Sequence, residues 1–420
     1  MFVMLVQILM KARRKTSNSP NLKSSIIRLL YFEKSLSCAE LSQELNKSVP
    51  VITKTINELI AEEFVTEVGY ASSSGGRRPL MYAIKPDALY IMAIAMDQLS
   101  TRIAIVDLNN DPLADIELVE LPLNNNPGAL TQLVSYINNY IIKSGVDRRK
   151  ILGIGIGMPG FVSLTENINY SYLDASGQDL TAYIFSATGL PTYIDNDSSL
   201  IALAEQRFGV AKSQQDVMVI NLGWGIGLGM IVNGNIYRGN NGFAGEFSHI
   251  PLFDEGALCS CGKKGCLEAE ASMLVVTEKA IEGIKQGRIT TLNSFIDDPL
   301  KLMGDALFEA ANKGDQFVID LLSDAGYKIG KALAILIHIM NPQTIVLSGR
   351  GAKAGKILLA PIQQALNKYC IPRLAVNTEL LISKLGFDGA IIGSSALVME
   401  HFDNEKLTIN VNQKTMEKTQ

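Results

Sequence analysis

One short stretch of the chain gathers the side chains that proteins use to bind transition metals. It holds three of the five cysteines and one of the three histidines within eighteen residues, namely His249, Cys259, Cys261 and Cys266. Three thiolates and one imidazole are a common ligand set for a tetrahedral zinc ion, and the glycines between the cysteines let the chain turn tightly around it. Four protein ligands leave no position for a reactive water, so we expect zinc with a structural role. The alternative, free thiols beside a coincidental histidine, fits such close spacing less well.

The N-terminal region has the spacing of a helix-turn-helix. Apolar residues three and four apart predict a helix over residues 22–32, and Ser37 with Glu40 has the form of a capping box that opens a second helix ending near Leu45. Ser48 can cap a third helix, and Pro50 suits the first turn of that helix. Three short helices with a tight turn before the third are typical of this DNA-binding motif.

A basic wing is expected to follow the third helix. Strands predicted over 64–68 and 80–84 flank a loop rich in glycine and serine that ends in paired arginines, which suits insertion into a narrow minor groove. The residues that we expect to contact operator DNA are Ser48, Pro50, Thr53, Lys54, Asn57, Arg77 and Arg78. The alternative is a small helical bundle that packs on the body or mediates dimerisation.

The charge distribution also favours a DNA-binding head. The whole chain has a net charge of −4, but residues 1–85 carry twelve Lys/Arg and seven Asp/Glu, a balance of +5 that leaves −9 for the remainder. Only the basic head is therefore expected to bind an anionic polymer such as DNA. With 420 residues, 47% of them hydrophobic, the chain is expected to form two or three ordered domains.

The body alternates strands and helices. Predicted hairpins over 90–97/102–108 and 217–222/228–232 each open an α/β stretch, which indicates an internal duplication and two lobes with a cleft between them. The other predicted elements are helices over 130–142, 180–188, 198–208 and 318–340 and strands over 151–158, 192–194 and 344–347. His338 is expected to be a core residue of the last helix, and His401 to begin a polar tail.

These patterns divide the chain into four parts: an N-terminal extension (1–20), a winged helix-turn-helix (21–86), the two-lobed body (88–400) and a polar tail (401–420). The first ten residues are apolar and the basic residues follow them, the reverse of the order in a secretory signal. No run is long and apolar enough for a membrane helix. We expect a cytoplasmic protein with no membrane partner.

The motifs of the body resemble those of the ROK family of repressors and sugar kinases. They are the Gly-Glu-Phe-Ser-His motif at 245–249, the cysteine run up to Glu268, the glycine-rich segment 153–160, Asp-Asn-Asp at 195–197 and Gly-x-Gly-Ile-Gly-x-Gly at 223–229. The resemblance covers residues 88–400, with a zinc loop at 245–268, and implies the α/β actin-like ATPase fold of sugar kinases. The added winged helix-turn-helix resembles the repressor branch, which includes xylose and N-acetylglucosamine repressors.

The resemblance also implies a sugar site in the cleft. The residues placed there are Asn196, Asp197, Glu246, His249 and Glu268. Carboxylates and amides suit this role because they hydrogen-bond vicinal hydroxyls, and in the family the zinc-bound histidine also reaches a sugar hydroxyl. Asp197 stands where the kinases have their catalytic base. Alternatively, Asn196 and Asp197 cap a helix and Glu246 is a solvated loop residue.

Two departures from the kinase pattern favour a sensor over an enzyme. The first hairpin has Asp-Gln-Leu-Ser-Thr at 97–101, where kinases have two glycines that let backbone amides approach ATP phosphates. Trp224, the only tryptophan, replaces a small hydroxyl residue in the second phosphate loop. We therefore expect binding of ATP and Mg²⁺ to be lost.

We expect a sugar-responsive transcriptional regulator, a repressor that binds a sugar or sugar phosphate and acts as a homodimer or homotetramer. Two such heads in an oligomer would meet two half-sites of an operator. An active ATP-dependent sugar kinase with an accessory DNA-binding head is the alternative, and activation of transcription stays open as well.

Overall fold

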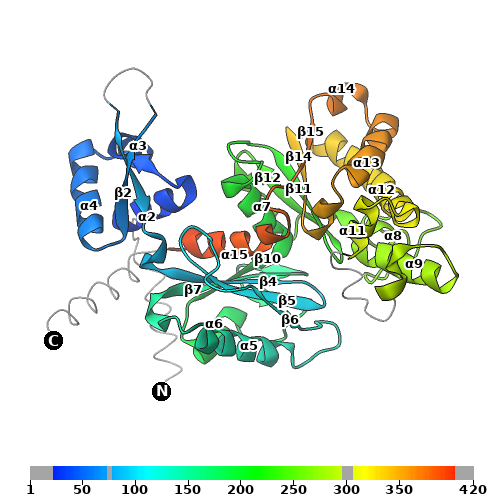
Figure 1. Cartoon of the computed structure of the whole chain (residues 1–420), viewed down its shortest axis with the longest axis horizontal. Helices are drawn as coiled ribbons and strands as arrows, with labels where there is room; N and C mark the ends of the chain where they lie inside the picture. The colour runs from blue at the N-terminus through cyan, green and yellow to red at the C-terminus, as the bar shows by residue number, and fades with distance from the viewer. Residues whose placement is uncertain (1–21, 73–77, 296–305, 403–420) are drawn as a thin grey trace.

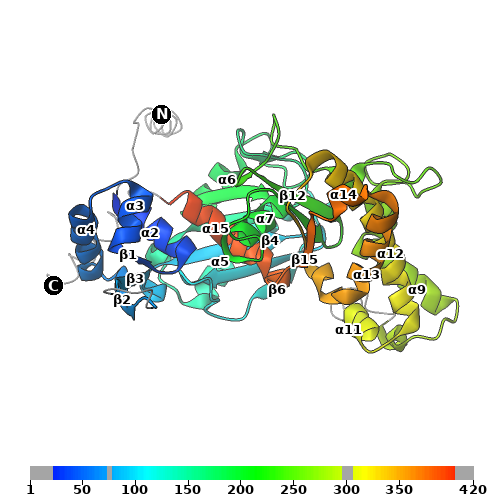
Figure 2. The ribbon, with the colours of Figure 1, turned by 90° about the horizontal axis from the view of Figure 1, so that it is seen from above.

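The computed structural model describes residues 22–72, 78–295 and 306–402, arranged as an N-terminal head and two α/β lobes. The head lies at one end of the molecule and the helices of the second lobe lie at the other, as both views show (Figures 1 and 2). Lobe 1 comprises residues 90–208 and the last helix, and lobe 2 comprises residues 217–382. Within the described residues, no helix is both long and apolar enough to cross a membrane.

The head is a winged helix-turn-helix. Its helices and strands are α2 (Leu22–Glu33), β1 (Leu36–Ser37), α3 (Cys38–Leu45), α4 (Val49–Ala61), β2 (Val65–Tyr70) and β3 (Leu80–Ile84), with the strands in the order β1-β3-β2. The predicted capping box is confirmed: the Ser37 hydroxyl accepts from the Glu40 amide, and the Glu40 carboxylate accepts from the Ser37 amide. Asn46 then adopts the left-handed conformation that ends α3. The prediction that Ser48 begins α4 is confirmed, with Pro50 in the first turn, although the Ser48 hydroxyl makes no capping hydrogen bond.

Lobe 1 is a five-stranded mixed sheet covered by helices on both faces. Its strands are β4 (Tyr90–Met96), β5 (Ser100–Val106), β6 (Glu117–Glu120), β7 (Ile151–Met158) and β10 (Thr192–Asn196), in the order β10-β7-β4-β5-β6. Its helices are α5 (Ala129–Ser144), α6 (Leu180–Thr188), α7 (Asp197–Phe208) and α15 (Gly389–Glu400), and a small hairpin joins β8 (Val162–Ser163) to β9 (Ile168–Asn169). The near-continuous apolar runs of β4 and β7 match this burial on both faces.

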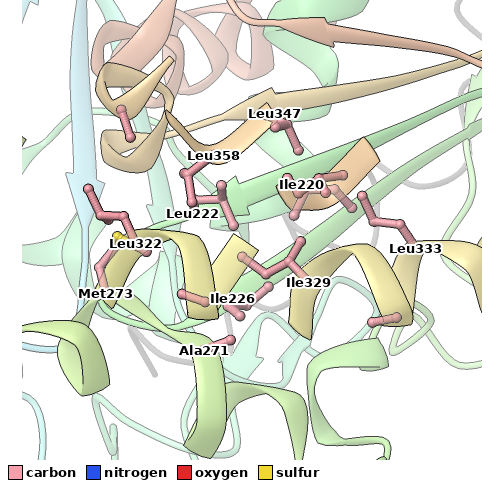
Figure 3. Close-up of a cluster of buried hydrophobic side chains, with 14 of the residues drawn as sticks. Ile220, Leu222, Ile226, Ala271, Met273, Leu322, Ile329, Leu333, Leu347 and Leu358 are labelled. Carbon is pink, nitrogen blue, oxygen red and sulfur yellow. The ribbon is translucent and has the colours of Figure 1, made fainter. Parts of the chain in front are cut away.

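Lobe 2 repeats the same sheet. Its strands are β11 (Val217–Leu222), β12 (Ile226–Val232), β13 (Asn235–Ile236), β14 (Thr344–Ser348) and β15 (Glu379–Ile382), in the order β13-β12-β11-β14-β15. Its helices are α8 (Leu267–Ala271), α9 (Met273–Lys285), α11 (Leu307–Asn312), α12 (Gln316–Met340), α13 (Lys356–Tyr369) and α14 (Pro372–Ala375). Figure 3 shows the core of this lobe, where Leu322, Ile329 and Leu333 of α12 pack with side chains of the sheet.

The two sheets support the predicted duplication. In each sheet the first three strands form an antiparallel meander, in which the first pairs with the second and the second with the third. The first strand also pairs with the fourth, and the fourth with the fifth, and both of these pairings are parallel. β4 to β6 thus correspond to β11 to β13, and β7 and β10 to β14 and β15. Short 3-10 segments connect the main elements, namely Pro86–Ala88, Arg148–Lys150, Phe247–His249, Thr291–Phe295, Arg350–Ala354 and Gly386–Asp388.

Helix α15 returns the chain from lobe 2 to lobe 1, where it packs against α7, β7 and β4. The sequence did not single out this helix, since it is apolar on all sides and has no amphipathic period. The predicted start of the polar tail is corrected: His401 stacks on Tyr193 with ring centroids 4.6 Å apart, and Phe402 is buried. His338 is also not a core residue, because its ring is exposed and its Nε2 accepts a hydrogen bond from the Ile371 amide.

The head is joined to lobe 1 by packed side chains. One hydrophobic cluster runs from the head helices through β4 to α7 and α15. Tyr31 and Phe32 at the end of α2 contact Phe208 at the end of α7, with ring centroids 5.6 and 5.9 Å apart. Arg207 lies over the Phe32 ring and pairs with Glu400 of α15 at 3.1 Å. A movement of α7 or α15 would therefore displace the head, because the packed side chains transmit it.

Candidate functional site

A cleft of about 440 Å³ lies between the two lobes, and all five of the residues predicted to bind sugar line it. They come from three places: the start of α7 (Asn196 and Asp197), the loop after β13 (Glu246 and His249) and the start of α8 (Glu268). The cleft is within the size range of small-molecule sites, and its walls combine apolar side chains with converging polar groups.

The start of α7 carries the first two of these residues. The Asn196 side-chain oxygen accepts hydrogen bonds from the amides of Ser198 and Ser199 at 3.0 and 3.2 Å, so Asn196 is the N-cap of the helix. Its side-chain amide donates to the Gly160 carbonyl at 3.3 Å. Asn196 thus lines the cleft while its polar atoms hold the backbone in place, which is the capping role weighed from the sequence.

Asp197 keeps more of its hydrogen-bonding capacity for a ligand than Asn196 does. One carboxylate oxygen accepts from the Ser198 amide at 2.7 Å, and the other accepts from the Asn221 side chain at 3.2 Å. Burial raises the pKa of Asp197 to about 7, and the negative charges of Asp97 and Glu246 add to the rise while the bonds from Ser198 oppose it. A carboxyl group with this pKa can accept or give a proton near neutral pH.

Glu246, His249 and Glu268 form the opposite wall. The Glu246 carboxylate lies 3.7 Å from His249 Nε2, and burial raises the pKa of Glu246. Glu268 accepts a hydrogen bond from the Ile226 amide at 3.3 Å. A side chain at Gly225 would bring a Cβ within 2.5 Å of the Glu268 carboxylate, so any other residue there would displace this carboxylate from its present position.

The four predicted metal ligands converge on one point. His249 Nδ1, Cys259 Sγ, Cys261 Sγ and Cys266 Sγ all lie within 4.8 Å of one another. Cys259 Sγ is 3.5 Å from His249 Nδ1, and Cys261 Sγ is 3.6 Å from Cys266 Sγ. A tetrahedron with Zn–S bonds of 2.3 Å has sulfur–sulfur edges of about 3.8 Å, so this donor set fits zinc. His249 turns Nδ1 to the thiols and Nε2 to Glu246, and it therefore links the metal cluster to the cleft.

The side of the cleft that corresponds to the phosphate loops is occupied by side chains. Asp97 accepts from the amides of Leu99 and Ser100 at 2.8 and 2.7 Å, so its carboxylate closes the β4–β5 turn. Trp224 is 7% exposed in the cleft wall, and its indole N–H has no partner among the described residues. Phosphate oxygens are bound by free backbone amides, but here the Leu99 and Ser100 amides donate to Asp97, and the Trp224 ring stands in the wall.

A second feature of the cleft, which the sequence did not indicate, is a stack of three side chains across the lobes. The Phe387 ring lies between the guanidinium groups of Arg102 and Arg350, at 4.0 and 4.2 Å from its centroid. Arg102 of β5 also pairs with Asp388 at 2.6 Å and donates to the Phe387 carbonyl. All three stacked residues line the cleft, but they lie far apart in the sequence, so no local pattern reveals the stack.

Four of the predicted DNA-contacting residues share one surface of the head. Pro50, Thr53, Lys54 and Asn57 line one shallow hollow on α4. The Thr53 hydroxyl donates to the Val49 carbonyl at 2.9 Å, whereas Lys54 and Asn57 point outward. Ser48 and Arg78 are exposed as well, and Arg77 lies outside the described residues.

A sequence model described as "ROK family" matches residues 92–401, the whole of the two-lobed body. The chain belongs to the ROK family. A glucokinase of Halalkalibacterium halodurans is 34% identical over 67% of this chain and 87% of its own length. A xylose repressor of Bacillus spizizenii is 29% identical over 87% of this chain and 92% of its own, and so extends over the head as well. Among solved structures, a ROK family transcriptional regulator described as a homologue of the Escherichia coli MLC protein matches with a TM-score of 0.69 and 25% identity, covering 90% of this chain and 94% of that one.

The ROK assignment confirms the fold expected from the motifs: an α/β kinase-like body preceded by a head of the winged helix-turn-helix type. The structure brings together the metal cluster expected from local spacing and the carboxylates that the family resemblance placed in the cleft. Sequence reasoning missed Arg238, which pairs with the buried Asp195 at 2.5 Å behind the cleft and so helps to fix the strand end before Asn196. Arg238 stands alone in a polar loop, and nothing in the local sequence indicates its partner 43 residues away.

Proposed function

We propose that this ROK protein is a sugar-responsive transcriptional repressor whose kinase-like body binds a sugar or sugar phosphate and does not phosphorylate it. One observation carries the proposal: helix α7 begins at the cleft with Asp197 and ends against the head with Phe208. A ligand held by Asp197 acts on the same rigid element that supports the head. The similarity to a xylose repressor and to a ROK transcriptional regulator agrees with this function.

The sugar would be held by Asp197, Glu246, His249 and Glu268, with Asn196 fixing the helix start. Several carboxyl groups on opposite walls of one cleft suit vicinal hydroxyls, each of which can give one hydrogen bond and receive another. Trp224 lines the same cleft and adds an apolar ring beside these polar groups.

Zinc bound by His249, Cys259, Cys261 and Cys266 would hold the loop that carries Glu246 and His249. In this arrangement the metal orients a sugar-binding imidazole and takes no part in chemistry, because four protein ligands complete its coordination.

The head would bind operator DNA through Ser48, Pro50, Thr53, Lys54, Asn57, Arg77 and Arg78. The hollow on α4 is open to solvent, and the exposed Lys54 and Arg78 provide the positive charge that phosphates require. A homodimer or homotetramer would present two heads to two half-sites. Sugar binding would then shift α7 and change the spacing of the heads, a shift between two states of different DNA affinity.

Sugar phosphorylation is the second candidate function, and two observations favour it. The glucokinase of Halalkalibacterium halodurans is 34% identical to this chain, and the pKa of Asp197, raised to about 7 by burial, suits a general base. The closed β4–β5 turn, Trp224 and the Arg102–Phe387–Arg350 stack weigh against it, because phosphoryl transfer depends on the positioning of ATP.

A screen of sugars by thermal shift, with and without Mg-ATP, tests the proposal, followed by a coupled assay of ADP release for each sugar that stabilises the protein. The proposal predicts stabilisation by at least one sugar, no further shift with Mg-ATP, no ADP release, and weaker binding of operator DNA in the presence of that sugar. Turnover above about 1 per second, within the ordinary range of enzymes, would identify a kinase.

A further inference from the structure

Three aromatic rings form a rim at the mouth of the cleft, outside the polar residues described above. Phe161, in the loop after β7, and Phe243, in the loop after β13, meet edge to face with ring centroids 5.5 Å apart. Tyr170, just after β9, lies against Phe243 at 5.9 Å. Phe161 and Tyr170 come from lobe 1 and Phe243 comes from lobe 2, so the rim bridges the two lobes.

Two of these rings, both from lobe 1, leave much of their surface uncovered, and Phe243 is half-buried between them and lobe 2. Phe161 is 42% exposed and Tyr170 is 57% exposed, whereas a phenylalanine that only filled space between lobes would be buried. The Phe161 amide donates to the Ser171 hydroxyl at 3.1 Å, and the Tyr170 amide donates to the Phe161 carbonyl at 2.9 Å. The lobe 1 part of the rim is thus held in place by hydrogen bonds of its own backbone amides, which lowers the cost of ordering it around a ligand.

A second hollow continues beyond the rim. It shares Ser171 and Tyr172 with the cleft, and Tyr170 stands in its wall. Its other polar lining residues include Asn125, Asn126, Asp174 and Gln178. Amides and a carboxylate beside exposed aromatic rings repeat the chemistry of the first site, which again suits hydroxyl groups around an apolar ring face.

We propose that the effector is an oligosaccharide of two or more rings, with its second ring on Phe161 and Phe243. This inference rests on the proposed function, which places the first ring on Asp197, Glu246, His249 and Glu268. One face of a pyranose presents only C–H groups, and these pack on the electron-rich face of an aromatic ring. Further rings would extend along the hollow beside Tyr170.

Fluorescence of Trp224, the only tryptophan and a residue of the cleft wall, provides the measurement. The full chain is titrated with matched pairs: glucose and cellobiose, xylose and xylobiose, and N-acetylglucosamine and chitobiose. In at least one pair the disaccharide is expected to bind at least about tenfold more tightly, the factor equivalent to 1.4 kcal/mol. Phe243→Ala and Phe161→Ala should each remove most of that ratio, and Phe243→Tyr should retain it.

Phe185→Ala is the matched control, because Phe185 is a 46% exposed phenylalanine of α6 that does not line the cleft. It should leave the ratio unchanged. Equal or weaker binding of every disaccharide overturns the inference and leaves the proposed sugar sensor standing. An equal loss of mono- and disaccharide binding in Phe243→Ala also overturns it, since the rim would then act only on lobe closure. Failure of every sugar to bind counts against the proposed function itself.

Discussion

Asp197 and Phe208 are the first and last residues of one helix, α7, so the cleft carboxylate and the aromatic contact with the head move as one body. Twelve helical residues span about 17 Å. The helix is flanked by α15, whose last residue, Glu400, pairs with Arg207 and accepts a hydrogen bond from Arg28 of the head. Two packed helices therefore connect the ligand site to the head, and a displacement at one end has little room to be absorbed between them.

Replacing the aromatic ring at the head end of α7 by a smaller apolar side chain should uncouple the sugar site from the DNA-binding head. Phe208→Leu removes the edge-to-face contact with Tyr31 while it keeps an apolar side chain at a half-buried position. We expect the variant to bind sugar and DNA, but the effect of saturating sugar on DNA affinity should shrink from the usual 1–3 kcal/mol of coupling to about zero. Fluorescence anisotropy with a DNA site selected on the wild-type protein measures this effect.

Tyr369→Ala is the control for this variant, because Tyr369 lies on α13 of lobe 2, far along the chain from the junction. It should retain full coupling. If Phe208→Leu responds to sugar as the wild type does, α7 is not the route between the sites.

The metal cluster should contain one zinc per chain. Cys261 is the exposed member, so Cys261→Ser removes a ligand with little loss of core packing. Losing a hydrogen-bond partner of a metal ligand typically lowers metal affinity 10–100-fold, and we expect the loss of the ligand itself to lower zinc affinity by more than this. The melting temperature should also fall, because bound metal stabilises only the folded state. Mass spectrometry of the metal content and thermal unfolding measure the two effects.

Cys38→Ser, in the head, is the matched control and should keep full zinc content. Sugar affinity should fall with the zinc, since His249 turns one ring nitrogen to the thiols and the other toward the cleft. Metal-free protein that binds sugar as tightly as the wild type would contradict the orienting role of zinc.

The sequence predicted elements and motifs well where the signal is local, and long-range contacts poorly. Strands β7 and β11 and helix α6 were predicted residue for residue, since apolar runs between turn residues define them. The four metal ligands lie within eighteen residues, so their proximity followed from spacing. The Arg102–Phe387 contact joins residues 285 apart, and the aromatic rim joins two lobes. Such contacts depend on how the sheets face each other, which no window of sequence contains.

Basic residues of the head should set both the affinity for DNA and its salt dependence. Lys54→Ala and Arg78→Ala each remove one exposed positive charge from α4 or from the wing. For each DNA phosphate that the protein no longer neutralises, the slope of log affinity against log salt should become shallower by about 0.9. Lys313→Ala removes an exposed lysine from lobe 2 and should change neither quantity. Unchanged binding by both head variants would exclude this face as the DNA interface.

Sugar binding should depend on pH through Asp197. Burial raises the pKa of this carboxyl group to about 7, with further contributions from Asp97 and Glu246, and Tyr172 also lies within its electrostatic reach. Ionised Asp197 accepts hydrogen bonds from hydroxyl groups on both oxygens, whereas the protonated form has one acceptor fewer. We therefore expect the dissociation constant for sugar to increase as the pH falls from 8 to 6, by at most about tenfold for each pH unit below 7.

Asp197→Asn tests this assignment, because an amide does not titrate. The variant should bind sugar more weakly at pH 8 and with a flatter pH profile, while Glu379→Gln, an exposed carboxylate of β15 outside the cleft, should keep the wild-type profile. In the sugar-free protein the sign is opposite: a native pKa above the unfolded value of 3.8 means that the free energy of unfolding decreases as the pH rises from 3.8 to 7. Tighter sugar binding at low pH would instead identify Asp197 as a hydrogen-bond donor, held protonated in the complex.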